Sequence, residues 1–375
     1  MGLSAFLTAT DFRIDRYVNP GNGIARIDGT ELTAEPRLRL GNPGDMLSGF
    51  LAGYVFHSKQ NETIDLFGGG AFHDKTLTRA VFGEATWKPS TLFDLTLGTR
   101  YEEEDRDRTG AAGAFITDFH KTFSAFLPRG TLAFHASEAV TLGATVGRGY
   151  NAGGAGFAFN PPFPSFTYKK ETVWNYEGFV RTALLDKRLS LNANVFFNDY
   201  SGLQLPFDVV QNPAAPATVI RNAERATTYG AEFEAKFQAM EGLSLTGSAG
   251  LLKTKVNRYD DPSIQGNDLA RSPAFSFSAG IAAQPFERVD AAFNVHYTDA
   301  YYSDEFNRAR GRTDPYALAD AQAGYTIHGA RLFVALTNIF NTKKAVTLTP
   351  GATPDKDIST MTRPRRLSGG VEFSF

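Results

Sequence analysis

The chain has 375 residues, 42% of them hydrophobic, and a formal net charge of -2, a balance that gives no sign of a nucleic-acid partner. It contains no cysteine, which excludes disulfides, thiolate metal sites and cysteine nucleophiles. No apolar run approaches the roughly 18 residues of a membrane-spanning helix, and the mean hydropathy is -0.25. A barrel in which only alternate residues face lipid would be hidden in such averages.

The first residues, 1–11, have no basic leader, and their apolar stretch is too short for a signal peptide. An exported protein should carry such a signal. We therefore expect the natural amino terminus to lie upstream of Met1.

Alternation of apolar and polar residues, bounded by turn residues, predicts about sixteen strands. The segment 289–298 is a clear case, because its odd-numbered residues are apolar and most of its even-numbered residues are polar. No segment shows a helical period. The predicted strands lie near residues 3–17, 31–40, 46–58, 76–88, 91–105, 118–135, 138–150, 171–184, 188–206, 219–238, 242–258, 271–284, 289–303, 315–327, 330–340 and 364–375.

The connections between these strands alternate in length. Short turns follow every second strand, for example at 41–45, 88–90 and 328–329. Long loops rich in Gly, Pro and charge are predicted between the others, at 18–30, 59–75, 106–117, 151–170, 207–218, 259–270, 304–314 and 341–363. This alternation is typical of outer-membrane barrels, which have short periplasmic turns and long outer loops.

The carboxyl-terminal strand supports the same fold. Leu367, Val371, Phe373 and the terminal Phe375 share one face. Such a strand resembles the ending of bacterial outer-membrane barrels, in which the last strand pairs with the first. We therefore predict an all-β transmembrane antiparallel barrel, and an even strand number places both termini on the periplasmic side.

Several motifs resemble the barrel of TonB-dependent receptors, the energised outer-membrane importers of siderophores and related nutrients. The likeness depends on the order and spacing of short patterns through most of the chain. They are the segments 79–87 with 95–102, 147–154 with 170–177, 222–234 and 336–341.

The resemblance implies a barrel of about 22 strands, preceded by a plug domain and a short TonB-contacting segment. About sixteen strands are counted here, so we expect residues 1–375 to be the later part of such a barrel, truncated at the amino terminus, without plug or signal peptide. The implied partners are outer-membrane lipid, an extracellular small molecule that could be a metal chelate and, for the full-length protein alone, the inner-membrane TonB complex. The implied location is the bacterial outer membrane, and no cofactor is implied.

Ligand capture is expected from aromatic and cationic residues of the outer loops and the inner wall. Self-packing of these loops and an interfacial aromatic girdle remain the alternative, and Trp87 is read as a residue of the periplasmic girdle. The candidate ligand residues are Arg148, Tyr150, Phe157, Phe159, Phe163, Phe166, Tyr168, Tyr301 and Tyr302. The residues expected to face the membrane are Phe233, Phe293, Val295, Val371, Phe373 and Phe375.

Other kinds of site are not supported. The G-x-G-x-x-A pattern at 147–152 lacks the following helix that a nucleotide site needs. The acidic run 102–108 could chelate a cation, but a solvated strand end is favoured. The six histidines have no zinc-like spacing, and no G-x-S-x-G occurs. No metal site, catalytic residue or enzyme activity is predicted.

Two functions other than energised uptake stay open at this point. A complete barrel of about 16 strands could be a passive porin. A soluble all-β binding protein is the second alternative, and it would stay in solution without detergent.

Overall fold

The computed structural model describes the chain except for residues 18–23, 66–68, 114, 159–163, 210–216 and 374–375. Sixteen antiparallel strands form one sheet, and each pairs with its neighbours in the order of the sequence. They are β1 (Gly2–Tyr17), β2 (Ile24–Leu40), β3 (Leu47–Ile64), β4 (Gly70–Ser90), β5 (Phe93–Ala112), β6 (Phe115–Ser137), β7 (Val140–Asn151), β10 (Glu171–Leu184), β11 (Leu189–Asp208), β12 (Thr218–Met240), β13 (Leu243–Arg258), β14 (Phe275–Phe286), β15 (Val289–Thr298), β16 (Tyr316–Ile327), β17 (Ala330–Thr337) and β20 (Arg366–Phe373).

Each of the sixteen predicted strands overlaps one strand of this sheet. Two short hairpins, which the alternation does not predict, lie in the long connections. They are β8 (Gly154–Phe157) with β9 (Ser165–Tyr168), and β18 (Ala345–Thr349) with β19 (Ile358–Met361). Two short 3-10 helices, η1 (Ala309–Gly311) and η2 (Pro354–Lys356), are the helical elements of the described residues.

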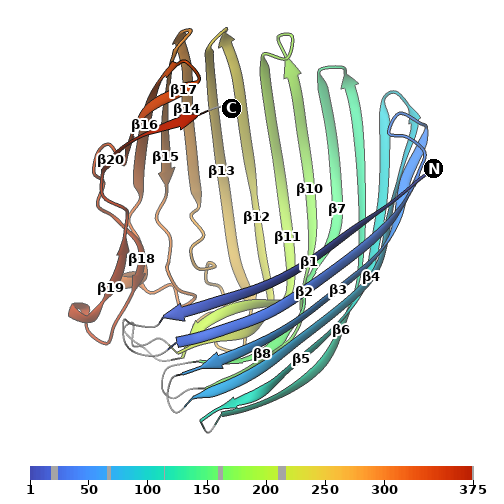
Figure 1. Cartoon of the computed structure of the whole chain (residues 1–375), viewed down its shortest axis with the longest axis vertical. Helices are drawn as coiled ribbons and strands as arrows, with labels where there is room; N and C mark the ends of the chain where they lie inside the picture. Colours follow the sequence, from blue (N-terminus) through green and yellow to red (C-terminus); the bar gives the residue numbers. More distant parts are fainter. Residues whose placement is uncertain (18–23, 66–68, 114, 159–163, 210–216, 374–375) are drawn as a thin grey trace.

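The sheet curls around an open interior, with β1 to β3 passing in front of the wall formed by β10 to β13 (Figure 1). The short turns lie at one end, called here the short-turn end, and the small hairpins lie at the other, the long-loop end. Both chain termini are near the short-turn end (Figure 1). No helix among the described residues is long and apolar enough to span a membrane.

The predicted pairing of the last strand with the first is not present in the described residues. There, β20 pairs with β17 and β1 pairs with β2, so each has one paired edge. The described sheet is therefore a wide, curled wall with a gap between β20 and β1.

Three of the predicted long loops, 18–30, 59–75 and 106–117, are largely wrong, because residues 24–30, 59–64, 70–75, 106–112 and 115–117 extend strands β2 to β6. Many of their side chains are polar on both faces, so the regular apolar alternation that marks the rest of the strands is interrupted. Ion pairs between neighbouring strands hold these extensions instead. Examples are Arg13 with Asp28 (2.6 Å), Arg26 with Asp15 (2.8 Å) and Arg108 with Asp74 (2.6 Å).

The buried apolar residues gather toward the long-loop end rather than in the middle of the sheet. One cluster packs Ile264 of the β13–β14 connection against Leu205, Phe207, Val219, Ala223 and Val256. A smaller one joins Ala25, Ile64 and Phe72. Neither cluster lies in the middle of the sheet, where the strands form a single layer whose two faces depend on what surrounds them.

Candidate functional site

Cross-strand registers show that the sheet has one apolar and one polar face. Residues directly opposite each other in antiparallel strands share a face. The row through Phe293 is apolar across nine strands: Leu184, Leu189, Phe237, Leu245, Ile281, Phe293, Ala321, Leu336 and Leu367. The next row, through Asn294, contains Ser190, Lys236, Thr246, Gly280, Asn294 and Asp320.

The residues expected to face the membrane lie on the apolar face. Phe233, Phe293 and Phe373 are 46%, 38% and 63% exposed. Val295 and Val371 are two and four residues from Phe293 and Leu367, which places them on that same face. Trp87 is also on it, at the short-turn end of β4 and opposite Leu47 and Leu95. Phe375 is outside the described residues.

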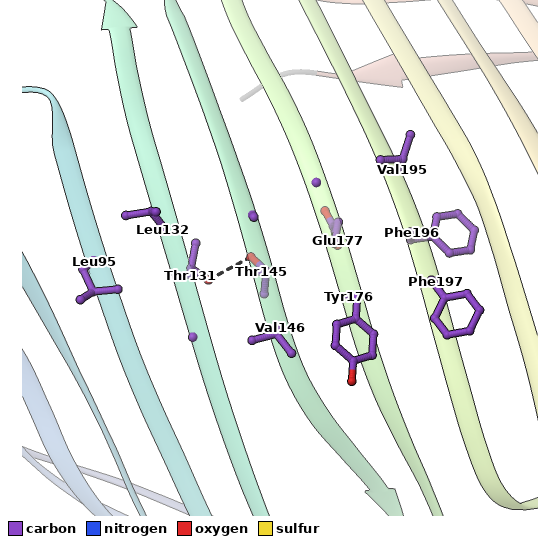
Figure 2. A pocket seen from close by; sticks show the side chains of 13 residues that line it. Leu95, Thr131, Leu132, Thr145, Val146, Tyr176, Glu177, Val195, Phe196 and Phe197 are labelled. Carbon is purple, nitrogen blue, oxygen red and sulfur yellow. Dashed lines mark hydrogen bonds between the residues drawn. The ribbon is translucent and has the colours of Figure 1, made fainter.

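A hollow in the apolar face has a volume of about 710 Å³. It forms because Gly130, Ala144 and Gly178 leave space between larger side chains such as Tyr176 and Phe197 (Figure 2). On the opposite face of the same strands, Thr131 and Thr145 are hydrogen bonded (2.9 Å). Lipid chains would fill this hollow in a membrane, so it is not assigned as a solute site.

The acidic run 102–108 lies inside β5 rather than at a strand end, so that interpretation is wrong. Strand geometry sorts it between the faces. Glu102 and Glu104 pair with Arg100 and Arg106 on the polar face. Asp105 lies on the other face, nearer the long-loop end than the apolar rows, and it pairs with Arg79 at 3.2 Å. Most of these carboxylates are thus paired with arginines, and no group of ligands that could hold a metal occurs among the described residues.

The β8–β9 hairpin follows β7 and crosses the mouth at the long-loop end. On one side its Phe157 ring lies 5.0 Å from the ring of Phe72 in β4. Arg106 of β5 donates a hydrogen bond to the Gly153 carbonyl (3.0 Å). Gly153 allows this approach, because a Cβ there would lie 2.9 Å from the Phe123 ring of β6. The hairpin therefore rests on the polar face of β4 to β6.

Two amides from the opposite wall hold the hairpin where it leaves and rejoins the sheet. The Asn222 side chain of β12 accepts a hydrogen bond from the Lys169 amide (2.8 Å) and donates one to the Lys169 carbonyl (2.9 Å). It also donates to the carbonyl of Gly202 (2.7 Å), which lies in a left-handed conformation at φ 70°. Gln204 of β11 donates to the carbonyls of Ala152 (2.8 Å) and Lys169 (3.2 Å).

Two cavities flank the hairpin. The larger, called here the basic cavity, has a volume of about 1180 Å³ between the hairpin and the ends of β7 and β10 to β13. Its lining includes Arg148, Phe166, Lys169, Lys170, Arg221, Asn222, Glu224, Asp260 and Asp261. The smaller, the paired cavity, has a volume of about 520 Å³ and is lined by Phe157, Tyr168, Arg106, Arg108, Glu62 and Asp74, among others.

The predicted ligand residues are therefore divided. Arg148 and Phe166 line the basic cavity, whereas Phe157 and Tyr168 line the paired cavity. The hydroxyl of Tyr150 is buried without a hydrogen-bond partner in the described structure. Phe159 and Phe163 are outside the described residues.

Tyr301 and Tyr302 have structural contacts in the connection between β15 and β16. The Tyr301 hydroxyl donates to the Val346 carbonyl (2.7 Å), and Tyr302 forms an isolated bridge with Arg312. Neither lines a cavity beside the hairpin. The sequence placed this pair beside a ligand-binding loop, which stays a prediction; in the structure the Tyr301 side chain and the Tyr302 backbone help to fix the connection.

A third cavity, of about 460 Å³, lies beside these loops and contains Asp208, Arg271, Asp304 and Glu305. Glu305 belongs to the connection between β15 and β16, and it is 7% exposed. Burial, with smaller contributions from Asp304 and Asp208, raises the pKa of Glu305 to about 7. This carboxyl is therefore partly protonated near neutral pH.

Sequence reasoning did not select Lys169, Lys170, Arg221, Gln204 or Asn222. Asn222 stood in a motif segment, but its role depends on two chain segments far apart in sequence. Lys169 and Lys170 directly precede β10; Lys170 also stood in a motif segment, but nothing in the sequence marked either lysine as a cavity residue. Only the folded hairpin brings them to one cavity.

Comparisons with known proteins identify the fold. The family model described as TonB dependent receptor-like, beta-barrel, matches residues 5–339. The ferric yersiniabactin uptake receptor FyuA from Yersinia pestis is similar at 17% identity and a TM-score of 0.77, covering 100% of this chain and 58% of that chain. The siderophore receptor PiuA from Acinetobacter baumannii is similar at 13% identity and a TM-score of 0.75, covering 94% of this chain and 57% of that one.

A third similar structure is the copper transporter OprC, at 13% identity and a TM-score of 0.74, with 100% of this chain and 62% of that chain covered. The chain thus spans somewhat more than half the length of these structures. At such low identity they establish the architecture, and their solutes do not transfer directly.

Proposed function

Because the chain belongs to the TonB-dependent receptor β-barrel family, we propose that it captures a scarce, bulky solute such as a ferric siderophore for TonB-energised uptake. The family consists of transport receptors of the bacterial outer membrane rather than enzymes. The long-loop end would then face the exterior, and the short-turn end the periplasm.

The observation that carries the proposal is a large basic cavity at the long-loop end of a sheet with one polar face. The basic cavity, of about 1180 Å³, exceeds the usual range of small-molecule sites, roughly 300–1,000 Å³. It combines the aromatic ring of Phe166 with the guanidinium group of Arg148. Such groups can hold a large metal chelate by stacking and by charge.

Three steps make up the proposed uptake. The long-loop end would capture the solute, and the polar face would line its path toward the periplasm. The inner-membrane TonB complex would supply the energy by displacing a plug domain of the full-length receptor. In this proposal the chain described here captures the solute and lines its path.

The direct test uses a bacterium that carries this gene, with a labelled ferric chelate as the iron source. We expect loss of the gene, or loss of TonB, to abolish accumulation of the chelate at concentrations too low for diffusion through porins. Accumulation that persists without TonB but needs the gene would instead support a passive channel. Accumulation unchanged by loss of the gene, with any of a panel of ferric chelates, would contradict the proposal.

A further inference from the structure

The two cavities that flank the β8–β9 hairpin differ in charge balance. Four cations, Arg148, Lys169, Lys170 and Arg221, line the basic cavity together with three carboxylates, Glu224, Asp260 and Asp261. Glu224 is already paired with Arg258 from outside the lining (2.6 Å). The four cations make no ion pair with any residue that the structure describes, so an excess of positive charge remains.

The hydrogen bond and the ring contact made by these cations involve neutral groups. Lys170 donates to the neutral carbonyl of Ser124 (2.7 Å), and Arg221 stands over the Phe207 ring at 5.9 Å. The Arg148 Nε is buried without a hydrogen-bond partner in the described structure. A buried donor without an acceptor is costly, and an anionic ligand would supply the missing acceptor.

The paired cavity is different, although its lining also has four cations and three carboxylates. Arg108 pairs with Glu62 (2.8 Å) and Asp74 (2.6 Å). Arg106 pairs with Glu104, which lies outside the lining. The local charge of this side is thus close to balanced, and the hairpin separates a positive compartment from a neutral one.

From these contacts we propose that the basic cavity selects a net-anionic solute, and that Asn222 is a positioning residue that fixes Lys169 and Lys170 toward it. This inference rests on the proposed uptake function and names the charge class of its solute. Asn222 binds both polar groups of the Lys169 backbone. These two hydrogen bonds therefore hold the lysines at the foot of the hairpin.

The experiment measures binding of two ferric chelates of similar size to the detergent-solubilised chain by titration calorimetry. One probe is an anionic tris-catecholate complex, and the other is a neutral tris-hydroxamate complex. We expect the anionic probe to bind about tenfold or more tightly than the neutral one, with an affinity that falls as salt rises from about 50 to about 500 mM.

Variants locate the effect. Lys169→Gln with Lys170→Gln should weaken binding of the anionic probe about tenfold or more, because two uncompensated charges are lost. Lys75→Gln removes one lysine from the paired cavity and should change the affinity by less than about twofold. Asn222→Ala should reduce the preference for the anionic probe, while Asn194→Ala, which removes an amide paired with Glu232 on the same two strands, should not.

The ratio of the affinities for the anionic and the neutral probe separates a positioning role from general damage to the fold. A loosened fold would weaken the binding of both probes by the same factor. Equal or tighter binding of the neutral probe, binding of neither probe, or equal effects of the Lys75 and Lys169/Lys170 variants would overturn the inference. If cells still accumulate the neutral chelate in a TonB-dependent way, the uptake function stands and the proposed charge selection alone fails.

Discussion

Phe293 and Asn294 are adjacent residues that test the two faces at the scale of one side chain. Phe293 lies mid-strand in β15, opposite Ile281 and Ala321, whereas Asn294 lies opposite Gly280 and Asp320. Phe293→Arg should lower the free energy of unfolding in phospholipid vesicles by about 2–4 kcal/mol, because it exposes a charge to hydrocarbon. Asn294→Arg should cost much less.

Denaturant titration of both variants, in the same lipid, measures this difference. The pair is its own control, since both variants introduce the same side chain one residue apart. Equal tolerance of the two arginines would contradict the assignment of the apolar face to lipid.

Glu305 makes the packing of its loop at the long-loop end depend on pH. Its raised pKa of about 7, against 4.5 for a free carboxyl, means that the docked loop binds its proton more tightly than the undocked loop does. Docking is therefore most favourable below about pH 4.5, and it weakens as the pH rises toward and through 7. Between low pH and a pH well above 7, the free energy of docking changes by about 3 kcal/mol.

The loop that carries Glu305 is tied to the neighbouring connection, so its opening can be measured. Asn267 donates to the Glu305 carbonyl (2.9 Å), and Asn307 donates to the Asp268 carbonyl (2.9 Å). We expect amide hydrogen exchange in residues 304–308 to be slower at pH 5 than at pH 8 after correction for the intrinsic rate. Glu305→Gln should remove most of this difference, and a pH dependence retained in that variant would assign it to other groups.

At the scale of elements, aromatic rings on the polar face cover glycines of the next strand. Phe179 of β10 lies directly opposite Gly143 of β7, and a Cβ on Gly143 would lie 2.2 Å from the ring. Arg181 in turn stands 5.0 Å from the ring of Phe179. Such ring-over-glycine pairs help to fix the register of neighbouring strands.

Gly143→Ala should therefore displace the Phe179 ring and lower the free energy of unfolding by about 1–3 kcal/mol. Gly53→Ala is the matched control, because the nearest atom to its Cβ, on Pro36, is 3.7 Å away. The control should be neutral or stabilise by up to about 1 kcal/mol. Both values come from denaturant titration, and equal losses would show that the ring is free to move.

The strands were predictable from the sequence because one face meets apolar surroundings, which imposes a period of two. The strand extensions within 59–75 and 106–117 were missed because charged and polar residues occur on both of their faces, which interrupts the period of two. Their pairing depends on partners such as Arg108 and Glu62, which are 46 residues apart. The β8–β9 hairpin was missed for a related reason, since Asn222 and Gln204 hold it from a distant part of the chain.

The candidate site was predictable only in part. Aromatic and cationic residues near 148–168 indicated a connection that does line cavities, but not its division between two of them. That division follows from the hairpin's contacts with Phe72 on one side and Asn222 on the other. Residue types alone also could not show which arginines are already paired with carboxylates.

At the scale of the whole molecule, the alternation of faces predicts an accessibility pattern that spans the sheet. The chain has no native cysteine, so single cysteines can be introduced without a background of other thiols. Cysteines in the row of Asn294, at positions 190, 236, 246 and 294, should react rapidly with a charged maleimide in lipid vesicles. Cysteines one residue away, at 189, 237, 245 and 293, should be protected by lipid and react at least about tenfold more slowly.

Detergent-solubilised, denatured protein provides the control, because all eight cysteines should then react at similar rates. The pattern must alternate on every strand tested, since successive side chains point to opposite faces along the whole wall. A row that reacts on some strands and is protected on others would contradict the registers that define the two faces. Protection of both rows would instead indicate that the sheet packs into a compact core, and the transmembrane arrangement would fail with it.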